Sequence, residues 1–173
     1  VTLIGDSAFG YCTALSSLKL GSGLQSIGEN AFICCSSLTN VTIPASVTSI
    51  GSGAFASCSS LQGIQVAAGN KNYTSVDGVL FTKSMDQLVC FPGGVDGDYT
   101  IPDGVAIIGG NAFGHNTGLT SITIPASMAR IGDYAFTNCI ELKDVYYQGT
   151  EAEWNSIDKG TGNEYLTSAT IHY

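Results

Sequence analysis

The chain has 173 residues, of which 44% are hydrophobic, and a formal net charge of −8 from 6 basic and 14 acidic side chains. This acidic balance disfavours nucleic acids and anionic membrane surfaces as partners, because both are held by clustered lysine and arginine side chains. No apolar run reaches the roughly 18 residues of a membrane-spanning helix, and no segment has the pattern of a signal peptide. We expect one folded domain with a sizeable core and no direct membrane insertion.

A repeated motif organises the chain from its first residues. The segment Ile27–Phe32 (Ile-Gly-Glu-Asn-Ala-Phe) recurs with the same spacing at 4–9, 50–55, 108–113 and 131–136. Successive units follow at intervals of 23, 23, 35, 23 and 23 residues, counted on the last predicted strand residue of each unit. A period of 23 lies inside the range of about 20–29 residues for leucine-rich repeats. The sequence therefore predicts a solenoid in which one unit carries a 12-residue insertion.

Each regular repeat predicts one short strand and one short helical turn. Val41 and Ile43 alternate with polar residues and are followed by Pro44, as expected for a strand that buries one face and then ends. The Ala-Phe pair is predicted to lie in a helical turn, with the rings of successive coils stacked in one column: Phe9, Phe32, Phe55, Phe113 and Phe136. A glycine column is expected to mark a positive φ or a tight corner: Gly5, Gly28, Gly51, Gly109 and Gly132.

The solenoid is predicted to be a single domain with four sections: regular repeats over 1–69, a divergent repeat over 70–100, regular repeats over 101–149 and a cap over 150–173. In the divergent repeat, Tyr73–Phe81 and Gln87–Phe91 are rich in strand-forming residues. We expect them to form a β-hairpin that replaces the usual turn and protrudes from the coil. Its tip is predicted at Lys83, Ser84, Met85 and Asp86.

The two ends of the chain are expected to differ. Thr150 and Glu153 have the spacing of a capping box, which predicts a short helix that places Trp154 over the last coil. Thr170–Tyr173 is predicted to form a closing strand, and such a cap shields the end of a solenoid core. The chain begins within a repeat, so we expect further repeats upstream or pairing of the open N-terminal end with another chain.

The string Ile-Gly-x-x-Ala-Phe-x-x-Cys-x-x-Leu-x-x-Val-x-Ile-Pro resembles the BspA-like leucine-rich repeats of bacterial and some protist surface proteins. The segments Asp77–Phe81 and Gly149–Trp154 also resemble features of that family, so the resemblance covers nearly the whole chain. It implies a right-handed leucine-rich-repeat β/α solenoid at an extracellular or cell-surface location. Members of the family are linked to adhesion to host matrix proteins or to aggregation between cells, and the family supplies no catalytic motif.

Four cysteines occupy one repeat column, which Asn116 fills in a fifth coil: Cys12, Cys35, Cys58 and Cys139. The functional alternatives are a metal site or disulfides, but no Cys-x-x-Cys pair is present and the adjacent Cys34 and Cys35 have a poor spacing for zinc. An amide can replace a thiol as a partner of the backbone but cannot join a disulfide. We therefore favour buried reduced thiols that face backbone groups, and the redox chemistry of Cys34 and Cys90 stays open.

No catalytic, metal or cofactor site is predicted. His115 and His172 have no serine, cysteine or carboxylate at a recognised catalytic spacing, and we interpret both as surface residues. The segments Asp77-Gly78 and Asp96-Gly97-Asp98 lack the full pattern of a calcium loop and are better explained as turns.

The outward face of the strand ladder is the main candidate for a binding surface. The alternative interpretation of this face is a solvent-exposed surface without a ligand, on which Thr and Ser side chains maintain solubility. Tyr146 is the exception among small side chains, since binding hot spots are rich in Tyr, Trp and Arg. The candidate residues are Lys19, Asn40, Thr42, Gln65, Thr100, Thr123, Lys143 and Tyr146. The hairpin tip, Lys83–Asp86, is a second candidate.

Two hypotheses of function follow. In the first, the chain is an extracellular or cell-surface adhesion or interaction module that binds a protein or a glycan through its strand face. In the second, it is a structural spacer within a larger surface protein. An enzymatic role is not expected, because regular repeats offer no cleft with clustered acids and bases.

Overall fold

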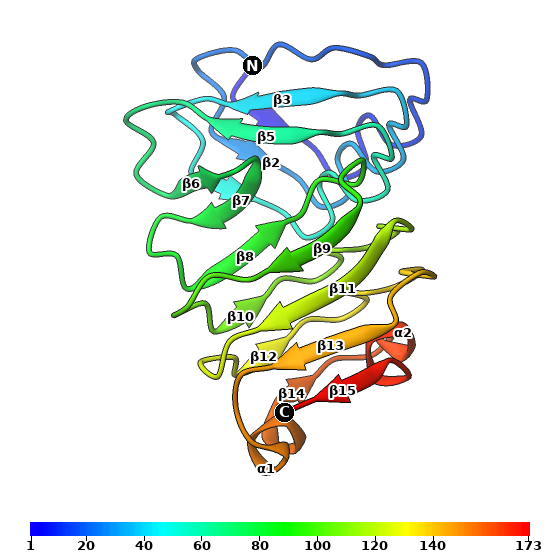
Figure 1. Cartoon of the computed structure of the whole chain (residues 1–173). Helices are drawn as coiled ribbons and strands as arrows, with labels where there is room; N and C mark the ends of the chain where they lie inside the picture. The colour runs from blue at the N-terminus through cyan, green and yellow to red at the C-terminus, as the bar shows by residue number, and fades with distance from the viewer.

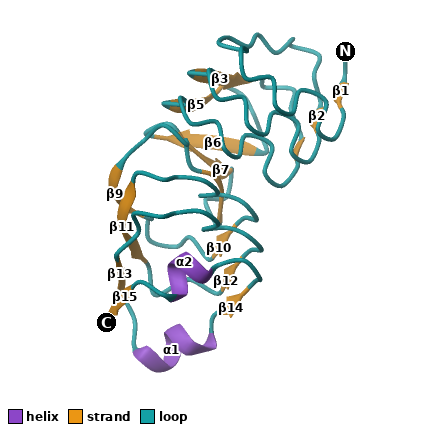
Figure 2. Cartoon of the chain, turned by 90° about the vertical axis from the view of Figure 1, so that its right-hand side faces the viewer, coloured by secondary structure: helices purple, strands orange, loops and turns teal.

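The computed structural model describes residues 1–173, whose coils stack into a parallel-strand solenoid (Figure 1). A full coil contributes a two-residue strand on one side and a longer strand on the other, as the side view in Figure 2 shows. The short strands are β1 (Leu3–Ile4), β2 (Ser26–Ile27), β4 (Ser49–Ile50), β10 (Ile107–Ile108), β12 (Arg130–Ile131) and β14 (Asp158–Lys159). The longer strands are β3 (Asn40–Ile43), β5 (Gly63–Val66), β9 (Gly97–Thr100), β11 (Leu119–Ile124), β13 (Asp144–Tyr147) and β15 (Thr170–His172).

Both ladders are interrupted in the middle of the chain. The longer strands form a two-stranded sheet, β3-β5, and a four-stranded sheet, β15-β13-β11-β9, and β5 does not pair with β9. The short strands form β1-β2-β4 and a second sheet in the order β14-β12-β10-β8-β7-β6. The predicted first long strand, which contains Lys19, is absent, because its coil is the outermost and pairs no strand with β3.

The insertion lies at this interruption as a three-stranded antiparallel meander. It consists of β6 (Tyr73–Val76), β7 (Val79–Thr82) and β8 (Gln87–Cys90). The predicted strand over Tyr73–Phe81 is broken by a turn at Asp77 and Gly78, which have φ of 50° and 81°; Asp-Gly is a favoured pair for a two-residue hairpin turn. The turn predicted at Lys83–Asp86 joins β7 to β8.

The expectation that the hairpin protrudes from the coil is wrong. The side chains of Val79, Leu80 and Phe81 are each at most 2% exposed. Leu80 packs in an N-terminal core of 16 residues, whereas Val79 and Phe81 pack in a C-terminal core of 23 residues. Strand β7 is therefore a shared wall between two cores, because it carries apolar side chains on both faces.

The turns that carry the Ala-Phe pair are not helical, contrary to the sequence-based expectation. Each full coil has two residues with positive φ four positions apart, such as Asn30 (53°) and Cys34 (59°), and an α-helix cannot contain such residues routinely. The N–H of Phe32 donates to the carbonyl of Ala54 in the next coil, at 2.8 Å. Alternate N–H groups thus bond to the neighbouring coil, and the turns continue the ladder between coils.

Close approach of the coils explains three members of the glycine column: Gly28, Gly51 and Gly132. None of its five members has a positive φ, so that part of the expectation is wrong. A Cβ atom on Gly28 would lie 2.5 Å from the backbone nitrogen of Asp6, and one on Gly132 would lie 2.6 Å from that of Gly110. Real Cβ atoms do not approach this closely, so glycine is what lets successive backbones bond here.

The phenylalanine column forms two stacks instead of one. The rings of Phe9, Phe32 and Phe55 are parallel with centroids 5.3 Å apart. In the second stack, Phe113 lies 4.8 Å from Phe136 and 4.9 Å from Phe91. Phe91, at the end of the insertion, takes the place that a column residue has in a regular coil. The break coincides with the boundary between the two cores.

A cap covers the C-terminal coil. Helix α1 (Glu151–Ser156) begins at the N-cap Thr150, whose side chain accepts from the backbone of Glu153 while the Glu153 carboxylate accepts from the backbone of Thr150. Trp154 is 5% exposed and lies 5.4 Å from the Tyr147 ring. Helix α2 (Glu164–Thr167) and β15 complete the cap. Neither helix is long and apolar enough to span a membrane.

Candidate functional site

The strand face of the N-terminal half carries small polar side chains only. Asn40 and Thr42 on β3 and Gln65 on β5 are exposed, and Thr42 lies directly beside Gln65 in the parallel register. Gly63, beside Asn40, adds no side chain. Lys19 is exposed but lies outside any strand. This patch offers hydrogen-bonding groups without an aromatic anchor, and its charged neighbour is Lys19, which lines a pocket together with Thr42.

The strand face of the C-terminal half is richer in functional groups. Thr100, Thr123, Tyr146 and His172 follow one another across β9, β11, β13 and β15. The ring of Tyr146, which is 45% exposed, stacks on the imidazole of His172 with centroids 4.5 Å apart. The structure thus brings three of the predicted residues together and adds His172, which sequence analysis assigned only to the surface. Its register with Tyr146 was hidden by the irregular length of the cap.

The polar groups beside this ladder are fixed by hydrogen bonds. The carboxylate of Asp98 accepts from the hydroxyls of Thr120 and Ser121, both at 2.9 Å, and these bonds lower the pKa of Asp98. Nε2 of His172 lies 2.7 Å from the Asp144 carboxylate. Lys143 is exposed and pairs with Glu141 at 3.3 Å. A rigid, pre-organised surface of this kind loses little side-chain entropy on binding.

The hairpin tip is also ordered by its own side chains. The Asp86 carboxylate accepts from the hydroxyls of Thr82 and Ser84 at 2.6 and 2.5 Å, which lowers the pKa of Asp86. Met85 has a φ of 61° and packs partly against the C-terminal core. Lys83 is the one member of the tip whose side chain is exposed and has no protein partner. The tip is therefore a tight turn with a single free charge.

Three of the four cysteines in the repeat column are buried and face backbone carbonyls, as predicted, whereas the prediction is wrong for Cys12, which is exposed in the outermost coil. The thiols of Cys35, Cys58 and Cys139 each donate to the carbonyl of a phenylalanine in the preceding coil, at 3.1–3.2 Å. Asn116 donates in the same way to the carbonyl of Pro92 at 2.9 Å. Burial raises the pKa of Cys58 and Cys139 to about 12. All six cysteines are free, with Cys90 buried and Cys34 partly buried.

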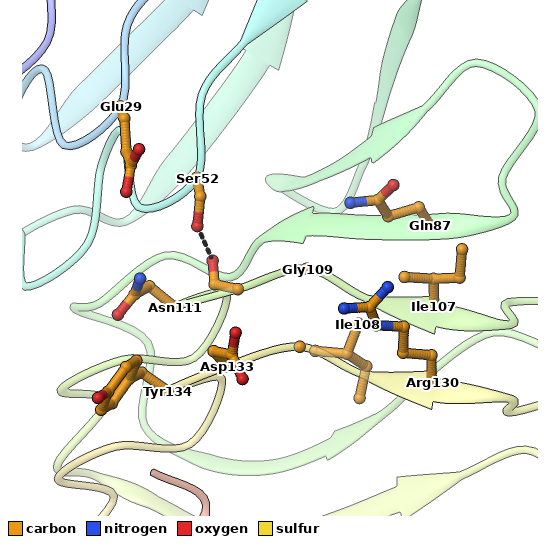
Figure 3. Close-up of a pocket in the computed structure, with 12 residues that line it drawn as sticks. Glu29, Ser52, Gln87, Ile107, Ile108, Gly109, Asn111, Arg130, Asp133 and Tyr134 are labelled. Carbon is orange, nitrogen blue, oxygen red and sulfur yellow. Dashed lines mark hydrogen bonds between the residues drawn. The ribbon is translucent and has the colours of Figure 1, made fainter. Parts of the chain in front are cut away.

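A groove that sequence analysis missed lies on the side of the short strands, where the two halves meet (Figure 3). Its volume is about 540 Å³. Glu29 and Ser52 line it from the N-terminal half, and Asn111, Asp133 and Tyr134 face them from the C-terminal half. The hydroxyl of Ser52 donates to the carbonyl of Gly110 across the junction at 3.0 Å. The sequence signal is faint: Gly110 replaces the side chain that other coils carry at this position.

Comparison with known protein families identifies the type of repeat in this chain. A sequence profile of the BspA type leucine-rich repeat region matches residues 1–95 and 97–167 in six copies. The chain belongs to the BspA-type leucine-rich repeat family. No curated protein matches it.

Solved structures agree with a leucine-rich repeat fold. The chain is similar to the pneumococcal vaccine antigen PcpA, with 32% identity, a TM-score of 0.78 and 84% of the chain covered. It is 25% identical to a leucine-rich repeat protein of T. pallidum, with a TM-score of 0.55 and 92% covered. A leucine-rich repeat protein from Eubacterium ventriosum, 22% identical with a TM-score of 0.53 and 84% covered, shares the fold. The chain spans 36%, 67% and 57% of the lengths of these three proteins.

BspA-type repeats are in general structural or interaction modules, and this chain shows no catalytic arrangement. His115 lies 3.1 Å from the Asn138 amide and His172 pairs with Asp144, so neither imidazole bonds to a serine or cysteine. No three His, Cys, Asp or Glu side chains lie close enough together to hold a metal ion.

Proposed function

We propose that this chain is an interaction module of an extracellular or cell-surface protein, and that it binds a protein or glycan ligand through the strand face of its C-terminal half. The observation that carries the proposal is the ladder Thr100-Thr123-Tyr146-His172, which ends in an exposed pair of stacked rings. An aromatic anchor beside fixed polar groups is the usual composition of a binding hot spot. The surface location is supported by the name of PcpA, a vaccine antigen.

The test is a solid-phase binding assay with purified extracellular-matrix proteins and a glycan array as probes. Tyr146→Ala is expected to weaken binding by at least about tenfold, because removing a central aromatic anchor costs about 2 kcal/mol. Thr42→Ala, on the opposite half of the same face, is the matched control and is expected to leave binding unchanged. Lys83→Ala tests the hairpin tip without deleting the buried strand β7.

A structural spacer is the second candidate. The strand face of the N-terminal half favours it, because Asn40, Thr42 and Gln65 provide no anchor. A spacer needs only the continuous stack and its cap. Uniform absence of binding in the assay above, with the chain folded, would support the spacer against the interaction module.

A further inference from the structure

The floor of the groove at the junction is formed by glycines. Gly109 and Gly132 form a floor without side chains between the short strands and the turns. The repeat position directly after the glycine column is occupied by Glu29, Ser52 and Asp133 in other coils. In the coil that follows the insertion, it is occupied by Gly110. A Cβ atom on Gly110 would lie 2.7 Å from the hydroxyl oxygen of Ser52, so glycine here lets the two halves approach each other. The groove beside this contact has a volume of about 540 Å³, within the range of about 300–1,000 Å³ for ligand sites.

The walls of this groove carry hydrogen-bonding side chains that the protein itself does not use. The carboxylate of Glu29, the amides of Gln87 and Asn111 and the hydroxyl of Tyr134 make no hydrogen bond within the chain, whereas Ser52 and Asp133 in the same lining are paired. In Figure 3 these groups surround the hollow from both halves. Carboxylates and amides each accept or donate at two neighbouring atoms, which suits ligands with adjacent hydroxyl groups.

Tyr134 occupies a repeat position at which the other coils carry smaller residues. The same column holds Ser7, Asn30, Gly53 and Asn111, and every member has a φ between 53° and 65°. Asparagine and glycine tolerate this left-handed conformation, whereas an aromatic residue is strained in it. The ring of Tyr134 packs beside Gly162 and remains 51% exposed. This ring provides an apolar surface at one end of a groove that Ile107 and Ile108 also line.

Charge and backbone pairing narrow the class of ligand. Glu29 and Asp133 make the groove acidic, and its one cation, Arg130, pairs with Asp158 at 3.4 Å, so phosphate or carboxylate ligands are disfavoured. The N–H groups of Gly109 and Gly132 bond to Leu88 and Ile108 at 2.9 and 2.8 Å. These two glycines therefore offer no N–H groups to an added peptide strand, and the lining offers no deep apolar pocket for peptide side chains.

We propose that the junction groove is a binding site for a neutral oligosaccharide. The free carboxylate and amides pair with the hydroxyl groups of the sugar, and the C–H face of a sugar ring packs against Tyr134. This site lies on the side of the short strands, away from the strand face, and it stands whether or not the strand face binds a ligand.

The test is calorimetric titration of the folded chain with six-unit oligosaccharides. The neutral probes are cellohexaose, maltohexaose, xylohexaose, mannohexaose and chitohexaose, and the acidic probe is hexagalacturonate. We expect at least one neutral probe to bind with a Kd below about 1 mM and the acidic probe not to bind. Asn111→Gly and Tyr134→Asn are each expected to weaken that binding at least tenfold. Both replacements occur naturally in this column, so the backbone conformation is kept.

Tyr146→Ala is the matched control, because it alters the strand face and leaves the groove intact. Thermal melts of all variants establish that they are folded. The proposal is overturned if no neutral hexasaccharide binds at millimolar concentration, if only hexagalacturonate binds, or if binding survives in both groove variants. Loss of binding in Tyr146→Ala alone would assign the sugar to the strand face and also overturn it.

Discussion

The two halves of the molecule are built from one repeat, yet they bury it to different degrees. In the N-terminal half, Phe32 is fully buried, whereas Phe9, in the same column one coil earlier, is 42% exposed. In the C-terminal half, the last column ring, Phe136, is fully buried beneath a cap that contains Trp154. A phenylalanine at this repeat position is thus buried only where another coil or the cap packs on each side of its own coil.

The contacts between the two halves differ from the contacts between neighbouring coils within each half. Within each half, neighbouring coils share strand pairing and stacked rings. Between the halves, the long strands do not pair, and the hydroxyl of Tyr73 accepts from the N–H of Ile50 at the edge of β4, 2.8 Å away. Backbone bonds between the N-terminal half and the insertion come from isolated positions: the N–H of Ile64 donates to the carbonyl of Gly78, and that of Gly94 to the carbonyl of Leu61, both at 2.8 Å. Strand β7 couples the two cores, because its side chains pack in both.

Thiol reactivity gives the largest expected contrast between an outer coil and a stacked one. Burial raises the pKa of Cys58 to about 12 from an ordinary value of 9, which lowers its thiolate fraction by about a thousandfold. Cys12, in the same column of the first coil, is exposed. We expect iodoacetamide at pH 8 to modify Cys12 within minutes and to leave Cys58 and Cys139 unmodified, as read by mass spectrometry of peptides. Equal rates would show that the first coil is covered or that the stack opens.

Phe55→Ala is expected to cost about 3–5 kcal/mol of unfolding free energy, because the ring is 1% exposed and closes the first stack. Phe9→Ala is the matched variant from the outer coil and should cost less than about 2 kcal/mol. Thr42→Ala, on the exposed strand face, should cost under about 0.5 kcal/mol. Urea melts measure all three. Similar losses for Phe55 and Thr42 would overturn the assignment of inner and outer residues.

Substitutions in β7 test whether it couples the two cores. Leu80→Ala and Phe81→Ala should each cost about 2–5 kcal/mol, because both side chains are fully buried. Leu80→Ala is expected to speed amide hydrogen exchange mainly in the N-terminal coils, and Phe81→Ala mainly in the C-terminal coils. Exchange that rises equally in both halves for both variants would mean that the cores open as one unit.

The features that sequence predicted well are those that recur with the period of the repeat. The interval of 23 residues places Asn40 beside Gly63 and Ser121 beside Asp144, and the structure has both pairs. The exchange of a cysteine for Asn116 indicated a backbone partner, and the thiols and the amide face carbonyls. Such features depend on local spacing, because each coil repeats the environment of its neighbour.

The features that the sequence did not predict lie where the insertion interrupts the regular repeat. Nothing in Val79–Phe81 alone says that both of its faces meet a core, because that depends on how two stacks lie across the insertion. The groove has the same origin, since Gly110 and Tyr134 are distant in sequence from Glu29 and Ser52. Phe91 had a usable signal: it precedes Phe113 by 22 residues, close to the repeat period.

The capping box gives the smallest expected effect and tests how the C-terminal half is closed. Thr150→Ala removes the hydroxyl that accepts from the N–H of Glu153 and should cost about 1 kcal/mol, whereas Thr150→Ser keeps that hydroxyl and should cost little. Hydrogen bonds from Thr150 lower the pKa of Glu153. The contribution of the ionised carboxylate is therefore present above its ordinary pKa and is lost as the pH falls through the lowered value.

The difference in stability between the wild type and Thr150→Ala should accordingly shrink in acid, as measured by thermal melts from pH 7 down to pH 3. Trp154 fluorescence reports the same event locally, because this residue follows Glu153 on α1 and packs on Tyr147. A loss of several kcal/mol in Thr150→Ala would show that the cap holds the last coil in place. An unchanged melt would show instead that burial of Trp154 is enough to close the C-terminal core.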